Sequence, residues 1–341
     1  MNQEEIVSLT HLLSDEYLDK MLSNIKQFWV FLYYAEVNST FRKSAIRVYE
    51  QKYQNDVIAC GRNIANDCRL SRDYALNAIK YFGPLIKRLH FLFTKSDELN
   101  QFFWDKILEH CGSTLIEFAI WDAVGLTIET ELPSLRKIIF GLYNLDESWT
   151  QINKWFPNVR EIEFHHSNEY HFSKHRGKVQ YPAFIDRVPH LERISFAIDL
   201  SEDSHATMAA QFLHSNTHIK TLEFHFDIEL LNIDQFISTV IWDDLSVSKL
   251  VIDGTVISLN KINQLHNIRI LEISRPHFYS ESELNNPEII LHKIEELKIN
   301  FSSHPKQKLE SATFDFILKC PKVEKAHHKT EIRLECGSCV Y

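Results

Sequence analysis

One apolar pattern recurs nine times along this chain and constrains what it can fold into. Each copy has an apolar residue, two variable positions, a second apolar residue, one variable position and a third apolar residue. The copies begin roughly 20 to 32 residues apart, a spacing that is typical of solenoids. The nine copies are Ile86, Leu89 and Phe91; Leu115, Phe118 and Ile120; Leu135, Ile138 and Phe140; Val159, Ile162 and Phe164; Leu191, Ile194 and Phe196; Ile219, Leu222 and Phe224; Val247, Leu250 and Ile252; Ile268, Leu271 and Ile273; and Ile294, Leu297 and Ile299.

The spacing within each copy predicts a β-strand. The second and third apolar residues lie two apart, so in an extended strand they share one face while the variable positions point to the other. One copy cannot bury its three apolar side chains alone. Stacked neighbours form a continuous core, worth roughly 1.5–3 kcal/mol per fully buried large side chain. Stability is therefore expected to come from stacking.

Segments with apolar residues at helical spacing separate several of these strands. They span residues 97–110, 205–214, 234–242 and 309–319. Right-handed connections between parallel strands place such helices on one side of a sheet. We therefore expect an α/β fold, a curved parallel sheet with helices outside and a concave sheet face left free.

Over approximately residues 82–323 the chain resembles leucine-rich-repeat proteins. The resemblance implies a leucine-rich-repeat solenoid whose concave face binds partners. The copies vary in length and lack a regular Asn or Cys three residues after the last strand position, which argues against an asparagine ladder.

The variable strand positions are rich in charged residues, which a concave face would present to a partner. Their charge runs from basic near the start of the repeats to acidic near the end. The alternative is a solvated face with cross-strand ion pairs, each worth about 0–1 kcal/mol. The predicted target-binding residues are Arg136, Lys137, Arg160, Glu161, Glu163, Glu192, Arg193, Lys220 and Glu223.

The N-terminal region differs from the repeats, with helical periodicity and no strand pattern. Ser14 is a predicted N-cap, because Asp15 and Glu16 follow it and favour the first turn of a helix. A second predicted helix, over residues 26–36, is apolar on nearly every side, which indicates burial on more than one side. A bridging helix is expected over residues 71–82.

This region resembles the F-box, a helical module that binds the Skp1-type adaptor of cullin-based ubiquitin ligases. The matching stretches are LSDEYL at residues 13–18 and VNSTFRKSA at residues 37–45, with Ser14 standing where the family usually has proline. A plain helical cap over the open end of the solenoid is the alternative. The resemblance implies that the adaptor, and through it a cullin, is bound by Leu13, Tyr17, Leu18, Leu22, Trp29, Phe31, Val37 and Phe41.

Composition limits the partners and the compartment. A net charge of −9 and a pI near 6.1 argue against broad nucleic-acid or anionic-membrane binding and favour a basic partner. No signal-peptide pattern is visible, the longest apolar run, residues 28–35, is too short to cross a bilayer, and the six cysteines lack the density of a disulfide scaffold. We expect neither a membrane nor a nucleic-acid partner, and a location in the cytoplasm, the nucleus or both.

Catalytic motifs are missing from the sequence, so we expect neither an enzyme nor a cofactor. Cys336 and Cys339 have zinc-ligand spacing, but a lone C-x-x-C favours free thiols in a tail. Four histidines crowd the segment from His165 to His175, where the flanking charges favour a solvated loop over a metal site. A metal-dependent enzyme at this loop is the weakest functional class.

The sequence thus predicts four parts: an F-box-like helical module over residues 1–53, a linker and first-repeat helix over 54–84, a leucine-rich-repeat solenoid over 85–328 and a tail over 329–341. Together they predict a non-catalytic substrate receptor of a Skp1-cullin-F-box type ubiquitin ligase, with an unknown protein target on the concave face. The alternative is a stand-alone interaction scaffold with a helical cap and no link to ubiquitin.

Overall fold

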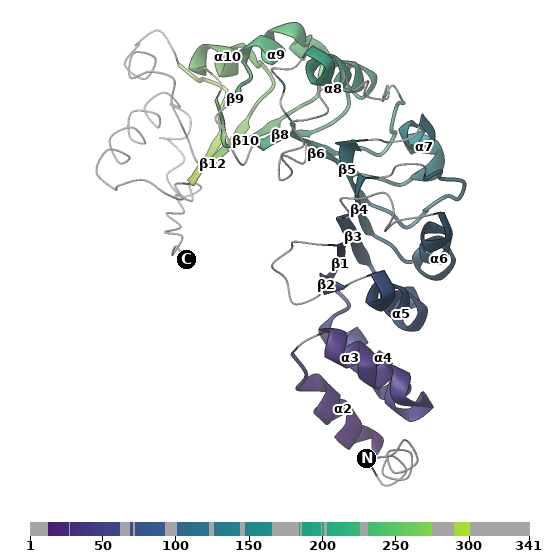
Figure 1. Cartoon of the computed structure of the whole chain (residues 1–341). Coiled ribbons are helices and arrows are strands. Elements are labelled where there is room, and N and C mark those ends of the chain that lie inside the picture. The colour runs from purple at the N-terminus through teal and green to yellow at the C-terminus, as the bar shows by residue number, and fades with distance from the viewer. Residues whose placement is uncertain are drawn as a thin grey trace, which may run out of the picture. The chain divides into compact units, whose positions relative to one another are not determined.

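The computed structural model places the chain in the α/β class, with parallel strands joined through helices and loops (Figure 1). It divides into two compact units, residues 1–159 and residues 160–341. The residues that the structure describes are 13–26, 28–61, 69–70, 72–92, 101–122, 126–143, 147–165, 184, 186–198, 200, 203–225, 231–256, 258–274 and 290–300.

The first described helices of the N-terminal unit are α2 (Asp15–Ser23), α3 (Phe28–Val37) and α4 (Ser39–Lys52). The predicted N-cap is confirmed, because the Ser14 side chain accepts a hydrogen bond from the backbone N–H of Tyr17 at 3.3 Å. Asn38 caps α4 in the same way and accepts from the backbone N–H groups of Thr40 and Phe41. Both caps satisfy amide groups that a helix start leaves without partners.

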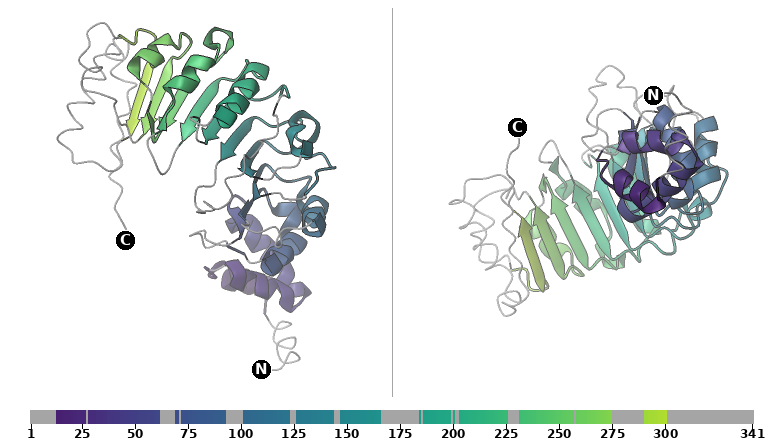
Figure 2. Two further views of the ribbon diagram at one scale, coloured as in Figure 1. Left: turned by 45° about the horizontal axis from the view of Figure 1, so that its top comes forward. Right: turned by 90° about the horizontal axis from the view of Figure 1, so that it is seen from below.

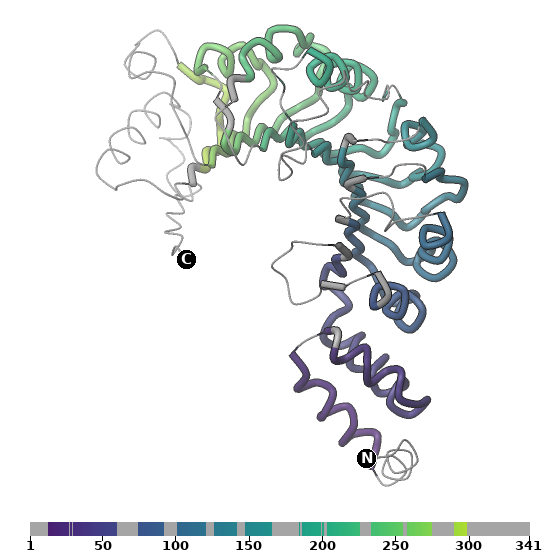
Figure 3. Tube along the Cα trace, in the orientation of Figure 1, coloured from purple at the N-terminus to yellow at the C-terminus, as the bar shows by residue number. Residues whose placement is uncertain are grey.

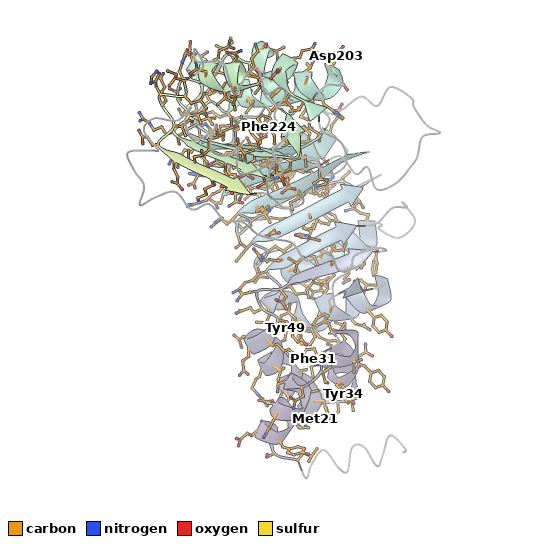
Figure 4. The ribbon with its side chains drawn as sticks, turned by 90° about the vertical axis from the view of Figure 1, so that its left-hand side faces the viewer. Met21, Phe31, Tyr34, Tyr49, Asp203 and Phe224 are labelled. Carbon is orange, nitrogen blue, oxygen red and sulfur yellow. The ribbon has the colours of Figure 1, made fainter. Side chains whose placement is uncertain are left out.

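An aromatic core joins these helices to α5 (Arg72–Phe82), which lies where a bridging helix was predicted. The Phe82 ring stacks on Tyr49 with centroids 4.7 Å apart and on Phe31 at 5.6 Å, while Phe28 meets Tyr53 edge-on at 5.3 Å. All five rings are buried, and we call them the aromatic junction. Figure 4 shows Phe31 and Tyr49 within these helices.

The sheet of the N-terminal unit has the strand order β2-β1-β3-β4-β5, and every pair is parallel. An irregularity in register follows the Ile120–Phe140 pair, after which Asp122 pairs with Tyr143, so β5 carries one extra residue there. The strands are β1 (Val57–Gly61), β2 (Arg69–Leu70), β3 (Arg88–Leu92), β4 (Glu117–Asp122) and β5 (Lys137–Tyr143).

Short helical segments precede or follow these strands, and their apolar side chains pack on the sheet. Trp104 and Trp149 lie 5.3 Å apart, and Trp104 also packs on Phe118 of β4 at 5.3 Å. Gly83 is required where it stands, because an added Cβ would lie 2.7 Å from the Cβ of His110. These helical segments are η1 (Gly83–Leu85), α6 (Gln101–Cys111), η2 (Glu147–Thr150) and α7 (Ile152–Trp155).

The C-terminal unit is built on a second run of parallel strands, in the order β6-β7-β8-β10-β12-β13. Two further short strands, β9 (Leu231–Asn232) and β11 (Thr255–Val256), pair with each other. The main strands are β6 (Glu161–His165), β7 (Arg193–Ala197), β8 (Thr221–His225), β10 (Lys249–Asp253), β12 (Ile270–Ser274) and β13 (Glu296–Asn300).

Helices lie on one face of this sheet (Figures 1 and 2). Phe224 of β8 faces them and packs edge-on against Phe236 at 6.0 Å; Figure 4 marks Phe224 between the strands and the helical layer. Among the described residues of this unit, no helix covers the opposite face, which we call the open face (Figure 2). The helical segments are α8 (Asp203–Ser215), α9 (Asp234–Thr239), η3 (Trp242–Asp244) and α10 (Leu259–Gln264).

A strand forms at each of the nine apolar patterns, and the tube in Figure 3 follows strand and connection along each unit. The first apolar residue of every pattern is buried, from Ile86 to Ile294. The predicted helices over 97–110, 205–214 and 234–242 correspond to α6, α8 and α9, while the helix predicted over 309–319 lies outside the described residues. Strands β1, β2, β9 and β11 were not predicted, because they lack the full pattern.

A series of polar side chains links the turns that precede successive strands. Each belongs to the residue just before the first apolar position of a pattern, and each bonds to a backbone carbonyl of the preceding turn. Since these bonds run from one strand–connection unit to the one before it, they hold the stack together where strands begin. The pairs are Thr114 to Gly83 and Ile86, Ser134 to Ser113, Asn158 to Pro133, His218 to Val188, and Asn267 to Leu245.

Replacing Asn158 with alanine removes one of these links. Its side-chain amide donates to the carbonyl of Pro133 at 2.9 Å. We expect a loss of about 0.5–1.5 kcal/mol in the unfolding free energy of the N-terminal unit, measured by urea denaturation. Asn153→Ala, on the exposed side of α7, is the matched control. Equal effects of the two substitutions would mean that the turn bond contributes nothing specific.

Candidate functional site on the open face of the C-terminal sheet

Strand register sorts the outward side chains of the C-terminal unit into three rows. The inward positions, such as Ile162, Ile194 and Leu222, form the core. The first outward row is Glu161, Arg193, Thr221, Lys249, Ile270 and Glu296. The second is Glu163, Ser195, Glu223, Val251, Glu272 and Lys298. The third contains His165, Ala197, His225, Asp253 and Ser274.

The predicted target-binding residues fall in two different places. Glu161, Glu163, Arg193 and Glu223 lie on the outward rows of the open face. Lys137 has the equivalent position on β5 of the N-terminal unit. The remaining four each precede a strand by one residue, and we call that position the strand entrance. They are Arg136, Arg160, Glu192 and Lys220.

At the strand entrances of the C-terminal unit, backbone bonds extend the sheet by one residue. The carbonyl of Arg160 accepts from the N–H groups of both Glu192 and Arg193, and the carbonyl of Glu192 accepts from Lys220 in turn. The exposed side chains of Arg160 and Glu192 form an ion pair at 3.4 Å. An exposed pair of this kind contributes about 0–1 kcal/mol, so the strand entrances fit the solvated alternative.

The centre of the open face holds an ionic network around one buried carboxylate. Glu223, whose side chain is only 4% exposed, pairs with Arg193 at 2.6 Å and with His225 at 3.0 Å. The other ring nitrogen of His225 lies 3.4 Å from Asp253. Arg193 also reaches Glu161 at 3.4 Å. Side-chain contacts of the network therefore link β6, β7, β8 and β10 in addition to their backbone pairing.

These contacts set the protonation states of the network. Burial alone would lower the pKa of His225, but hydrogen bonds to Asp253 and Glu223 raise it to about 9. Burial would raise the pKa of Glu223, but hydrogen bonds from His225 and Arg193 hold it below its ordinary value. At neutral pH the network therefore holds a carboxylate, a guanidinium and an imidazolium side by side.

His225 and Asp253 were missed by sequence reasoning. Each follows the last apolar residue of its pattern, Phe224 and Ile252 respectively, so strand alternation places both on the outward face. Extending the outward set by one residue beyond each pattern would have found them.

The outward face of the N-terminal sheet carries a smaller ionic group. Glu117 of β4 is buried and pairs with His90 at 2.8 Å and with Arg88 at 3.2 Å, both on β3. The hydrogen bond to His90 is the main cause of the lowered pKa of Glu117, and the nearby charge of Lys137 adds to it. Lys137 thus lies beside a carboxylate that other groups already engage.

The predicted adaptor-binding residues divide by burial. Leu18, Leu22, Phe31 and Phe41 are buried in the core of the N-terminal helices, where they support the fold of the module. Tyr17, another residue of the predicted set, has 58% of its surface exposed. Leu13 and Val37 are half-buried, and the side chain of Trp29 lies outside the description.

Tyr33 on α3 was not predicted as a contact, although it is 63% exposed. Its ring meets that of Tyr34 edge-on at 6.1 Å, and Tyr34 stacks in turn on Phe41 at 5.9 Å. The all-apolar character of the 26–36 segment hid which positions face outward, because helical periodicity has no contrast there.

The metal hypotheses rest largely on residues outside the ranges that the structure describes. No group of three or more His, Cys, Asp or Glu side chains in those ranges could hold a metal ion. His166, His171 and His175, like Cys336 and Cys339, lie outside them. The same ranges contain no helix with both the length and the apolar character needed to span a membrane.

Comparison with known proteins adds no assignment, since no family model matches the chain and no curated protein is significantly similar to it.

Proposed function

We propose that this protein is a non-catalytic substrate receptor of the F-box and leucine-rich-repeat type. The observation that carries the proposal is the order of parts along the N-terminal unit: a capped helical module with exposed tyrosines, then two short strands and a bridging helix, then the parallel strands β3, β4 and β5, each formed at a recurring apolar pattern. The helices coincide with the two stretches that resemble the F-box.

The proposed adaptor surface consists of Tyr17, Tyr33, Leu13 and Val37. Exposed aromatic side chains anchor many protein interfaces, since they bury large apolar area and lose little side-chain entropy. The buried part of the predicted set, including Leu18 and Phe31, holds the helices that present these side chains. A Skp1-type adaptor bound there would link the chain to a cullin.

In this proposal the protein contributes proximity and no bond-making chemistry. A target held on the sheet face would meet a tethered ubiquitin carrier at high effective concentration, which raises the rate of transfer to nearby lysines. The finer fold assignment, a leucine-rich-repeat solenoid following an F-box, belongs to the same proposal, as does a location in the cytoplasm or nucleus where such ligases act.

Charge substitution of the exposed tyrosines tests the adaptor surface. We expect Tyr17→Glu and Tyr33→Glu each to weaken binding of a Skp1-type adaptor at least tenfold, about 1.4 kcal/mol, because a carboxylate would be desolvated in an apolar interface. Binding is measured by co-purification and titration of the full chain. Phe102→Glu, on an equally exposed ring of α6, is the control and should leave binding unchanged.

A second function is favoured by the aromatic junction. Since Phe82 of α5 stacks on Tyr49 and Phe31, the first helices also cover the end of the following fold, as the cap of a stand-alone scaffold would. The same titration separates the two functions. A wild-type chain that is folded by circular dichroism but shows no adaptor binding at micromolar concentration leaves only the scaffold.

A further inference from the structure

The open face of the C-terminal unit carries an excess of negative charge. Its outward rows hold six carboxylates against three Lys or Arg side chains and one imidazolium, which leaves two negative charges in excess. The carboxylates are Glu161, Glu163, Glu223, Asp253, Glu272 and Glu296, and the cations are Arg193, Lys249, Lys298 and His225. Charge complementarity on this face therefore favours a basic partner.

Ser195 supplies a second and independent observation. Register places it between Glu163 of β6 and Glu223 of β8 in the second outward row. The residue is only 5% exposed, and its hydroxyl oxygen has no hydrogen-bond partner among the described residues. A buried hydroxyl without a partner costs about 1–3 kcal/mol, so the fold alone gives no reason for serine at this position.

The side chains around Ser195 define what could satisfy it. Glu163 offers acceptor oxygens only, while a serine hydroxyl offers lone pairs as well as a proton. An ammonium or guanidinium group has several N–H donors and a positive charge. It can therefore donate to a carboxylate oxygen of Glu163 and to the hydroxyl oxygen of Ser195 at the same time. An acidic ligand would add to the negative excess, and a neutral one would leave it uncompensated.

We propose that the open face binds a basic segment of a partner protein, with one lysine or arginine side chain received between Glu163 and Ser195. The carboxylate of Glu163, which is 23% exposed and lies 3.9 Å from the His165 ring, accepts from the incoming cation together with the serine hydroxyl. Arg193 and His225 hold Glu223 on the other side and keep that wall of the site fixed. If the protein is the proposed receptor, this basic segment belongs to its target, and only that identification rests on the proposed function.

The test uses the full chain and a fluorescein-labelled oligolysine of about ten residues, with an oligoglutamate of equal length as the opposite-charge probe. We expect oligolysine to bind and oligoglutamate not to bind. Glu163→Gln should weaken oligolysine at least about fivefold by fluorescence anisotropy. Glu192→Gln removes the same charge from the strand entrance before β7 and should change affinity less than about twofold.

Ser195→Ala gives a readout that a structural role would not produce. Since no hydrogen bond is lost in the free protein, we expect the melting temperature to stay equal or rise. Affinity for oligolysine should nevertheless fall about threefold, because one acceptor for the cation is gone. Opposite effects on stability and binding would identify the hydroxyl as part of a ligand site.

Four results would overturn the inference: no oligolysine binding, preferred binding of oligoglutamate, equal losses in Glu163→Gln and Glu192→Gln, or a destabilised Ser195→Ala variant. Equal losses would indicate binding to overall charge alone. None of these assays contains an adaptor. Failure of the basic site therefore leaves the adaptor titration unaffected, and failure of adaptor binding leaves the basic site standing on its own.

Discussion

Replacing Phe82 with alanine is expected to lower the unfolding free energy of the N-terminal unit by about 3–5 kcal/mol, the range for removing a buried phenylalanine ring. The ring is fully buried and contacts Tyr49, Phe31 and Phe28 across two other helices, with the closest centroid 4.7 Å away. Removing the ring leaves a cavity where α3, α4 and α5 meet. The helices would have to shift relative to one another to fill it.

The position of Phe82 makes the loss cooperative. It is the last residue of α5, directly before the 3-10 turn that leads into β3. Hydrogen exchange measured by mass spectrometry should therefore show faster exchange in α2, α3 and α4 as well as in α5. Phe102→Ala, an exposed ring on α6, is the control and should leave exchange unchanged. Faster exchange confined to α5 would show that the first helices are stable without the junction.

The aromatic junction also changes how truncation is interpreted. Deleting the first helices would expose Phe82, which is buried and packs on Phe28, Phe31 and Tyr49 of those helices. Loss of folding after deletion is then expected for a docking module and for an end cap alike. Point substitutions at the exposed Tyr17 and Tyr33 separate the two functions, because they leave this core intact.

The sequence was sufficient to locate most strands, because each pattern carries its own instruction: two apolar residues two apart, preceded by a third. The alternation of side chains along each strand also indicates which charged residues share the inward face. Arg160 stands two residues before the inward Ile162, so it shares the inward parity and cannot belong to the outward rows. The same argument applies to Glu192 and Lys220.

Other features depend on neighbours that a linear pattern does not reveal. In the sequence, Glu223 resembles any other outward glutamate. Strand register brings its buried carboxylate against Arg193 of the neighbouring strand and beside His225. The burial of Leu18 and Phe31 follows from helix packing, which single-helix periodicity predicts poorly when nearly all positions are apolar.

Glu223 itself gives the second large prediction. Glu223→Gln keeps the shape of the side chain but leaves Arg193 and His225 without their shared anion. Breaking a fully buried pair costs about 3–5 kcal/mol, and since Arg193 is 43% exposed we expect about 2–3 kcal/mol here. Glu272→Gln, which removes a more exposed partner of Lys249, should cost less than about 1 kcal/mol.

The network also predicts how stability changes with pH. The pKa of His225 is raised from 6.5 to about 9, so its stabilising contribution is complete below pH 6.5 and is lost as the pH rises through about 9. The pKa of Glu223 is lowered from 4.5, so its contribution is complete above pH 4.5 and is lost in more acidic solution. The combined contribution of His225 and Glu223 to the stability of the C-terminal unit is therefore greatest between about pH 4.5 and 6.5.

Urea unfolding of the C-terminal unit, followed by hydrogen exchange of peptides from β7 and β8, checks both effects. Between pH 6.5 and 9 the wild-type unit should lose up to about 3 kcal/mol, an upper limit because His225 remains partly exposed. In Glu223→Gln this alkaline decline should shrink, since the imidazolium has lost one of its two carboxylate partners and its pKa falls. An equally steep decline in the variant would show that other groups cause the pH dependence and that the contact between Glu223 and His225 does not.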